Sequence, residues 1–99
     1  MAEHRFVMVI FMSSQNSYDE IATPVLNKAV DWLRFAPNNW LVWTSTSPDR
    51  WYLRLKPILK SGDTLLICEV DMSRRSGNMP RSFWDFVKAR VSKQADSGS

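Results

Sequence analysis

The sequence predicts a small α+β domain, and three observations support this. Two segments are apolar enough for buried strands, Phe6–Met12 at every position and Asp63–Val70 over most of its length. Two others, near Ser47 and Pro80, carry the serine and proline signals that begin helices. The chain has 99 residues, and at 44% hydrophobic it can build one core. One domain with mixed elements follows.

The first predicted strand is Phe6–Met12, "FVMVIFM", which is apolar on both faces. The sequence "SYDE" that follows has the pattern of a capping box. In that motif the Ser17 hydroxyl accepts from the third amide of the helix, and Glu20 reaches back to the capping amide. We therefore expect a helix that begins at Ser17.

Pro24 interrupts this first helix, because it has no amide hydrogen and clashes with the preceding turn. Either the helix kinks at Pro24, or a new helix begins there with Thr23 as its cap. In both cases helical spacing predicts the same apolar face, made of Ile21, Val25 and Ala29.

The stretch Asp31–Ser45 allows two interpretations. Pro37–Asn39 is a turn sequence, and aromatic and branched residues flank it on both sides. If Asp31–Ala36 and Asn39–Ser45 form a hairpin, the order is β-α-β-β-α-β with a final helix, a ferredoxin-like arrangement. If the first helix instead continues to Arg34, the order is β-α-β-α-β-α. The local pattern leaves both open.

The next segment, "SPDRWYLRLKPILKSG", predicts a helix with Ser47 as its cap, Pro48 at the first position and Asp49 on the positive end of the helix dipole. We expect Pro57 to kink its last turn and Gly62 to end it. Four residues share its apolar face: Trp51, Leu55, Ile58 and Leu59.

The C-terminal part begins with a strand at Asp63–Val70 and a loop at Arg74–Asn78, which is rich in Ser, Gly and Asn. A final amphipathic helix is predicted over Pro80–Lys93. We expect a single domain over residues 1–93 and a disordered tail over 94–99. The final helix turns one apolar face inward: Phe83, Val87 and Val91.

Positive charge is concentrated near the C-terminus. The net charge is +3, yet residues 74–93 hold six basic residues and one acid, while the other seven basic and nine acidic residues sum to −2. Such a cluster can be a nucleic-acid footprint or the solvated outer face of a helix. The candidate phosphate contacts are Arg74, Arg75, Arg81, Lys88 and Arg90.

Three segments resemble a known family: "WLRFAPNNWLV", "KPILKSGDTLLICEV" and "GNMPRSFWDFV". They are similar to the SinR-like small proteins related to the CRISPR-associated protein two endonucleases. The resemblance runs from about Trp32 to Val87. It implies the ferredoxin-like fold with an additional C-terminal helix, and hence the hairpin. It also implies a homodimer that binds nucleic acid. The matching blocks are Asn39–Val42, Leu55–Pro57 with Leu65–Val70, and Gly77–Pro80 with Trp84–Phe86.

The chain departs from this family at the end of the first strand. The family pattern ends that strand with "SYD", whose aspartate is the proposed metal ligand from each subunit. Here Met12 occupies that place, and a thioether does not bind a hard cation such as Mg²⁺. We therefore assign no catalytic residue, and expect Mg²⁺ only if nuclease activity survives. Glu69 and Asp71, two apart on a strand, are weak metal-ligand candidates or simply its polar end.

Other functional signals are sparse. Trp40 and Trp43 can stack on bases or pack in a core. The single cysteine, Cys68, and the single histidine, His4, make neither a disulfide nor an ordinary zinc site within one chain.

The N-terminus lacks the long apolar core of a signal peptide, and no stretch is long enough to span a membrane, so we expect a cytoplasmic protein. We also expect a two-fold dimer formed through sheet faces or the C-terminal segments, because Phe6–Met12 is apolar on both faces.

Three functions remain: a nucleic-acid-binding dimer without metal-dependent cleavage, a protein–protein interaction module, and a small-molecule regulatory domain. The last is disfavoured because no glycine-rich ligand loop is present.

Overall fold

The computed structural model describes residues 3–94, and this part of the chain forms an α+β domain with a four-stranded antiparallel sheet and three α-helices. Residues 95–99 of the predicted tail lie outside the described residues. None of the helices described is long and apolar enough to cross a membrane. The elements are β1 Arg5–Met12, α1 Asp19–Leu26, β2 Asp31–Ala36, β3 Asn39–Thr44, α2 Pro48–Leu55, β4 Thr64–Val70 and α3 Arg81–Lys88.

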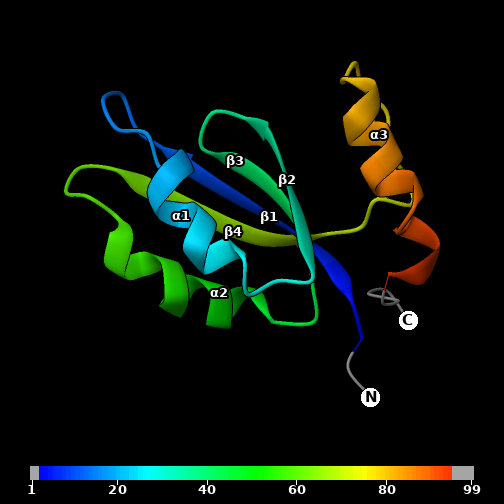
Figure 1. The fold of residues 1–99 in the computed structure, drawn as a ribbon, viewed down its shortest axis with the longest axis horizontal. Helices are drawn as coiled ribbons and strands as arrows, with labels where there is room; N and C mark the ends of the chain where they lie inside the picture. The colour runs from blue at the N-terminus through cyan, green and yellow to red at the C-terminus, as the bar shows by residue number, and fades with distance from the viewer. Residues whose placement is uncertain (1–2, 95–99) are drawn as a thin grey trace.

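The hairpin interpretation of Asp31–Ser45 is correct, because β2 and β3 pair antiparallel across a turn at Pro37–Asn38. The strand order is β2-β3-β1-β4. β1 therefore lies between β3 and β4, which explains why it is apolar on both faces. Figure 1 shows α1 and α2 together on one side of the sheet, with α3 set apart from them near one end.

Asn38 fixes this turn to the start of α1. Its backbone has φ 65°, a left-handed value that asparagine tolerates better than most residues. Its side-chain Oδ1 accepts from the Tyr18 amide at 2.7 Å, and its Nδ2 donates to the Asn16 carbonyl at 3.0 Å. Its own amide donates to Asp19 Oδ1 at 3.0 Å. The β2–β3 turn and the loop after β1 are thus one hydrogen-bonded unit.

The predicted capping box is wrong. α1 begins at Asp19 with Tyr18 as its N-cap residue and has no side-chain cap, while the Ser17 hydroxyl accepts only from the Asp19 amide at 3.3 Å. The physical reason is the burial of Tyr18: its side chain is completely buried and its amide is bound to Asn38. Tertiary packing thus places the helix start two residues after the predicted cap.

Pro24 lies inside α1, so the alternative in which a new helix begins at Thr23 is wrong. The buried face is also displaced from the predicted one. Ala22 and Leu26 are completely buried, whereas Ile21 is 39% exposed. α1 ends at Leu26, so the predicted core residue Ala29 lies beyond it, partly buried against the same core.

α2 is formed as its local signals predict. The Ser47 hydroxyl accepts from the Arg50 amide at 3.4 Å, and Pro48 occupies the first turn. The helix proper ends at Leu55, and a single 3₁₀ turn at Lys56–Ile58 accommodates Pro57. Gly62 ends the segment with φ +86°, a conformation that glycine adopts without strain.

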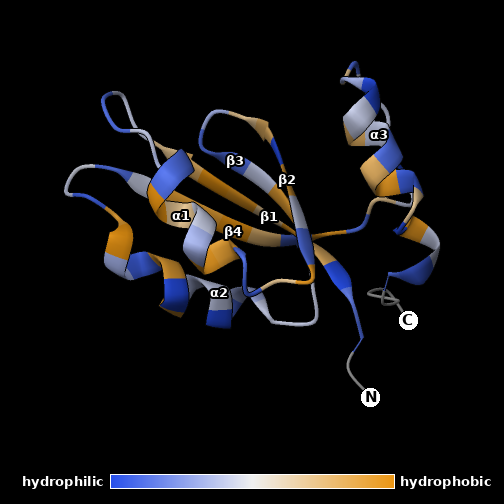
Figure 2. Ribbon diagram, in the orientation of Figure 1, coloured by the Kyte–Doolittle hydropathy of each residue, from blue (hydrophilic) through white to orange (hydrophobic). Residues whose placement is uncertain are grey.

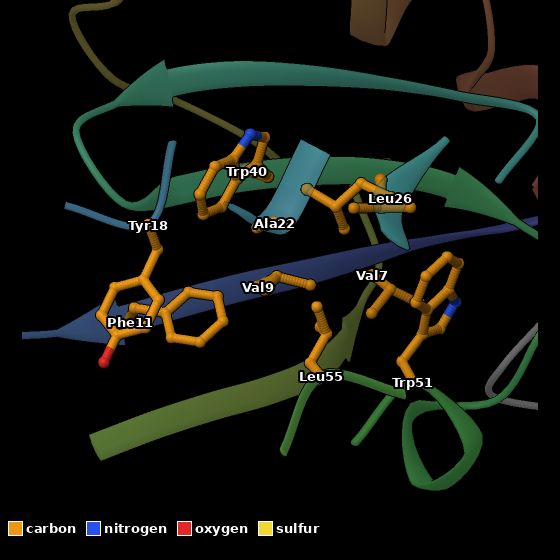
Figure 3. Packing of buried hydrophobic residues seen from close by; sticks show 10 residues of the cluster. Val7, Val9, Phe11, Tyr18, Ala22, Leu26, Trp40, Trp51 and Leu55 are labelled. Atoms are coloured by element: carbon orange, nitrogen blue, oxygen red, sulfur yellow. The ribbon is translucent and has the colours of Figure 1, made fainter. Parts of the chain in front are cut away.

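Each face of the sheet has its own core. α1 and α2 cover the first face, where Figure 3 shows Trp51 against Val7 and the Phe11 ring beside Tyr18. α3 packs on the second face through Phe83 and Val87, as predicted. The helix ends at Lys88, earlier than predicted, and Val91 lies in a 3₁₀ turn at Val91–Lys93, partly buried against the same core. The first core is Val7, Val9, Phe11, Tyr18, Ala22, Leu26, Trp40, Val42, Trp51 and Leu55; the second is Phe6, Leu41, Trp43, Phe83 and Val87.

Candidate nucleic-acid interface

The loop between β4 and α3 presents two of the predicted cations. Arg74 and Arg75 are both exposed, and the Arg75 guanidinium donates to the Met72 carbonyl at 3.1 Å. The base of the loop is held by Asp71, whose Oδ1 accepts from the Ser73 amide at 2.9 Å and from Gln94 at 2.6 Å. The loop is therefore anchored at its start, while the two arginines face solvent.

The outer face of α3 carries two more of the predicted cations. Arg81 and Lys88 are exposed, on the side opposite the buried Phe83 and Val87. The one acid of α3, Asp85, lies 3.9 Å from the Arg81 guanidinium, and their side chains are 68% and 93% exposed. An ion pair so exposed is weak, so Arg81 stays available to a phosphate. Figure 2 shows hydrophilic colour on the outer turns of α3.

Arg90 is used within the fold. Its guanidinium donates to Asp31 Oδ2 at 2.5 Å and to the Phe86 carbonyl at 3.0 Å, and lies 4.0 Å from the centre of the Phe86 ring. Its side chain is 22% exposed. These contacts fasten the end of α3 to the start of β2. Of the five candidate cations, four therefore face solvent and Arg90 positions the helix.

The two carboxylates proposed as weak metal ligands are bound to different partners. Glu69 Oε1 accepts from the Arg5 guanidinium at 2.9 Å. Asp71 lies just beyond the end of β4, and the Ser73 amide, followed by the Ser73 hydroxyl, lowers the pKa of its carboxyl. Within residues 3–94, no three His, Cys, Asp or Glu side chains gather in a metal-binding group.

The tryptophans proposed for base stacking are core residues. Trp40 is completely buried and Trp43 is 6% exposed, so the packing interpretation is confirmed. Phe6 and His4 both pack against the Trp43 ring, with centroids 4.9 and 5.6 Å away. Neither indole face is open to a nucleotide in this structure.

A second basic surface, on the outer side of α2, was missed at the level of sequence. Lys56 and Lys60 are exposed, Tyr52 is 45% exposed, and the Lys56 ammonium lies 5.9 Å from the centre of the Tyr52 ring. Leu53 is 65% exposed next to them. The spacing of Tyr52 and Lys56, four residues apart, was the available signal. This surface and α3 lie on opposite sides of the sheet, because α2 and α3 contribute to different cores.

Comparisons with known proteins return no match from family models, from curated proteins or from solved structures.

Proposed function

We propose that this protein binds nucleic acid through the basic surface formed by Arg74, Arg75, Arg81 and Lys88. One observation carries the proposal: these four cations are exposed on one continuous segment that contains a single exposed acid, Asp85. Phosphate contacts from Arg and Lys supply most of the affinity of proteins that bind nucleic acid without sequence preference. A helix face and an anchored loop present such contacts without a preformed cavity.

We further propose that the fold is ferredoxin-like and that the chain is a dimeric relative of the SinR-like proteins. The element order β-α-β-β-α-β, the strand order β2-β3-β1-β4 and the additional α3 support the first part. The three sequence blocks that resemble that family support the second. The dimer is part of the same proposal.

Metal-dependent cleavage is proposed to be absent. Met12 is the last residue of β1 and is 50% exposed, at the place of the aspartate in the resembling family. A thioether supplies neither charge nor a hard donor to Mg²⁺. Glu69 is bound by Arg5, so it would have to give up that ion pair to serve a metal.

Purified protein is therefore expected to leave duplex DNA and RNA intact in the presence of Mg²⁺ or Mn²⁺. The measurement is gel analysis of labelled substrates over a long incubation. Cleavage that persists through purification and disappears in Glu69→Gln or Asp71→Asn would show that these carboxylates form a site of their own.

The binding proposal is tested by titrating labelled duplex DNA and duplex RNA at several salt concentrations. The double variant Arg74→Ala, Arg75→Ala is expected to weaken binding about equally on all sequences, because phosphate contacts carry no base information. For DNA, the slope of log affinity against log salt should become smaller by about 2, since each phosphate that the variant no longer neutralises accounts for roughly 0.9.

The matched control removes two exposed cations from the opposite side of the sheet, with Arg50→Ala on α2 and Lys28→Ala just after α1. It changes the net charge by the same amount and should leave the salt slope close to that of the wild type. Absence of any binding at low salt would remove the proposal. If both double variants weaken binding equally, the binding depends only on the net charge of the protein and not on this surface.

The second candidate, a protein–protein interaction module, is favoured by a different observation. Leu66 and Met12 are 49% and 50% exposed on the second face of the sheet, although both are apolar. If titration shows no nucleic-acid binding, this candidate becomes the leading one.

A further inference from the structure

The two edges of the sheet differ in how they are protected from pairing with another strand. β2, at one edge, carries the charges of Asp31 and Arg34 and has a register shift between Arg34 and Ala36. α3 is fastened to it through the ion pair of Arg90 with Asp31. Charges, irregularities and covering elements are the usual means by which an edge strand is prevented from pairing.

β4, at the other edge, has none of these protections. Its sequence "TLLICEV" contains no lysine, arginine, proline or glycine. It pairs with β1 in continuous register from Phe6 opposite Val70 to Met12 opposite Thr64. Its single charge, Glu69, is bound by Arg5 on β1. A regular apolar edge of this kind is a template for a further strand.

The face beside this edge is also only partly covered. Side chains alternate along a strand, so Leu66 and Cys68 lie on the same face as Val70, next to Met8 and Met12 of β1. α3 covers the Val70 end of this face, whereas Leu66 and Met12 remain half exposed. The unprotected edge and the uncovered apolar side chains are therefore adjacent.

We propose that β4 pairs antiparallel with β4 of a second copy about a two-fold axis, which joins the two sheets into one. The inference deepens the proposed function by naming the interface of its dimer, and does not require that nucleic acid be bound.

The sequence of β4 is compatible with itself in this arrangement. In a two-fold antiparallel pair, residues equally distant from the axis face each other. With the axis at the central residue, Ile67, Leu66 faces the partner's Cys68 and Leu65 faces the partner's Glu69. The only charged residue does not oppose its own copy, so no like charges meet. The half-exposed Leu66 gains an apolar neighbour from the other subunit.

The test uses two exposed leucines that receive the same substitution. We expect the wild-type protein to sediment as a concentration-dependent dimer. Leu66→Lys on β4 should raise the dimer dissociation constant about tenfold or more, since the two-fold axis introduces the new charge twice. Leu53→Lys on α2, which is 65% exposed, should leave it unchanged. Circular dichroism checks that both variants fold.

Hydrogen exchange on the wild-type protein provides a measurement that needs no variant. Alternate amides of β4 should be protected only at concentrations where the dimer forms, while amides at the free edge of β2 should exchange equally at all concentrations. A monomer at several hundred micromolar would overturn the proposal. So would equal dissociation constants for the two variants, or a dimer without added protection in β4. Because no nucleic acid is present, none of these outcomes bears on whether the basic surface binds it.

Discussion

Replacing Trp40 by alanine is expected to lower the free energy of unfolding by about 3–5 kcal/mol, as truncation of a buried tryptophan generally does. Trp40 is completely buried in the first core, where Phe11 meets its ring edge-on at a centroid distance of 6.0 Å. It also faces Val9 of the central strand in the sheet register. Domains are stable by only about 5–15 kcal/mol, so this decrease can be a large part of the total.

The measurement is urea denaturation followed by circular dichroism. Tyr52→Ala is the control: this aromatic residue is 45% exposed on α2, and its removal should cost well under about 1 kcal/mol. Trp40→Phe should cost less than Trp40→Ala, because it leaves a smaller cavity. It also removes an indole N–H that has no hydrogen-bond partner among the described residues. Equal destabilisation by Trp40→Ala and Tyr52→Ala would contradict the burial of Trp40.

Replacing Tyr18 by phenylalanine is expected to cost about 1–3 kcal/mol, because it leaves polar groups without their partner. The Tyr18 hydroxyl donates to Asp63 Oδ2 at 2.5 Å and accepts from the Lys60 amide at 3.0 Å. The ring itself stacks on Phe11 at a centroid distance of 4.1 Å, and phenylalanine keeps that stacking. The substitution therefore isolates the hydroxyl, which joins the start of α1 to the turn before β4.

The same hydroxyl makes stability depend on pH at both ends of the range. The hydrogen bond from Tyr18, followed by the one from Asn16, holds the pKa of Asp63 below its ordinary value. This contribution to stability is complete above about pH 4 and is lost as the pH falls through the lowered pKa. Burial, followed by the hydrogen bond to Asp63, raises the pKa of Tyr18. That contribution is complete below about pH 10 and is lost as the pH rises through the raised pKa.

Tyr18→Phe should therefore flatten the alkaline limb of the stability curve and weaken the acid limb. Asp63→Asn should weaken the acid limb, to which Asp71 also contributes, and retain part of the alkaline one, since burial still raises the pKa of Tyr18. Thermal denaturation from about pH 3 to pH 11 measures both limbs. Curves for Tyr18→Phe and the wild type that stay parallel over this range would show that the network does not titrate as described.

Elements with strong local signals were predictable from the sequence. Ser47 and Pro48 begin α2 through a hydroxyl that bonds three residues ahead, and Gly62 ends that segment with a positive φ. The apolar runs of β1 and β4 depend only on residue type and length. The exposure of two cations, Arg74 and Arg75, follows from the polar composition of their loop. The exposure of Arg81 and Lys88 follows from the helical period of α3, which places them away from its apolar face.

What the sequence could not determine depends on partners distant in the chain. Asp31–Ser45 forms a hairpin because β3 pairs with β1, whose residues lie 29 to 39 positions earlier in the chain. The helix starts later than predicted because Tyr18 is buried and held by distant partners: its amide donates to Asn38, 20 residues away, and its hydroxyl to Asp63, 45 residues away. Arg90 is not part of the proposed basic surface, because its guanidinium is bound to Asp31, 59 residues away.

The physical reason is the range of the interactions. Capping, turn chemistry and side-chain period act within a few residues, so the sequence alone determined α2, β1, β4 and the apolar face of α3. Burial and ion pairing depend on which elements meet across the sheet. Only the tertiary structure decided that Trp40 and Trp43 are core residues, that Arg90 holds α3 in place, and that β4 is an unprotected edge.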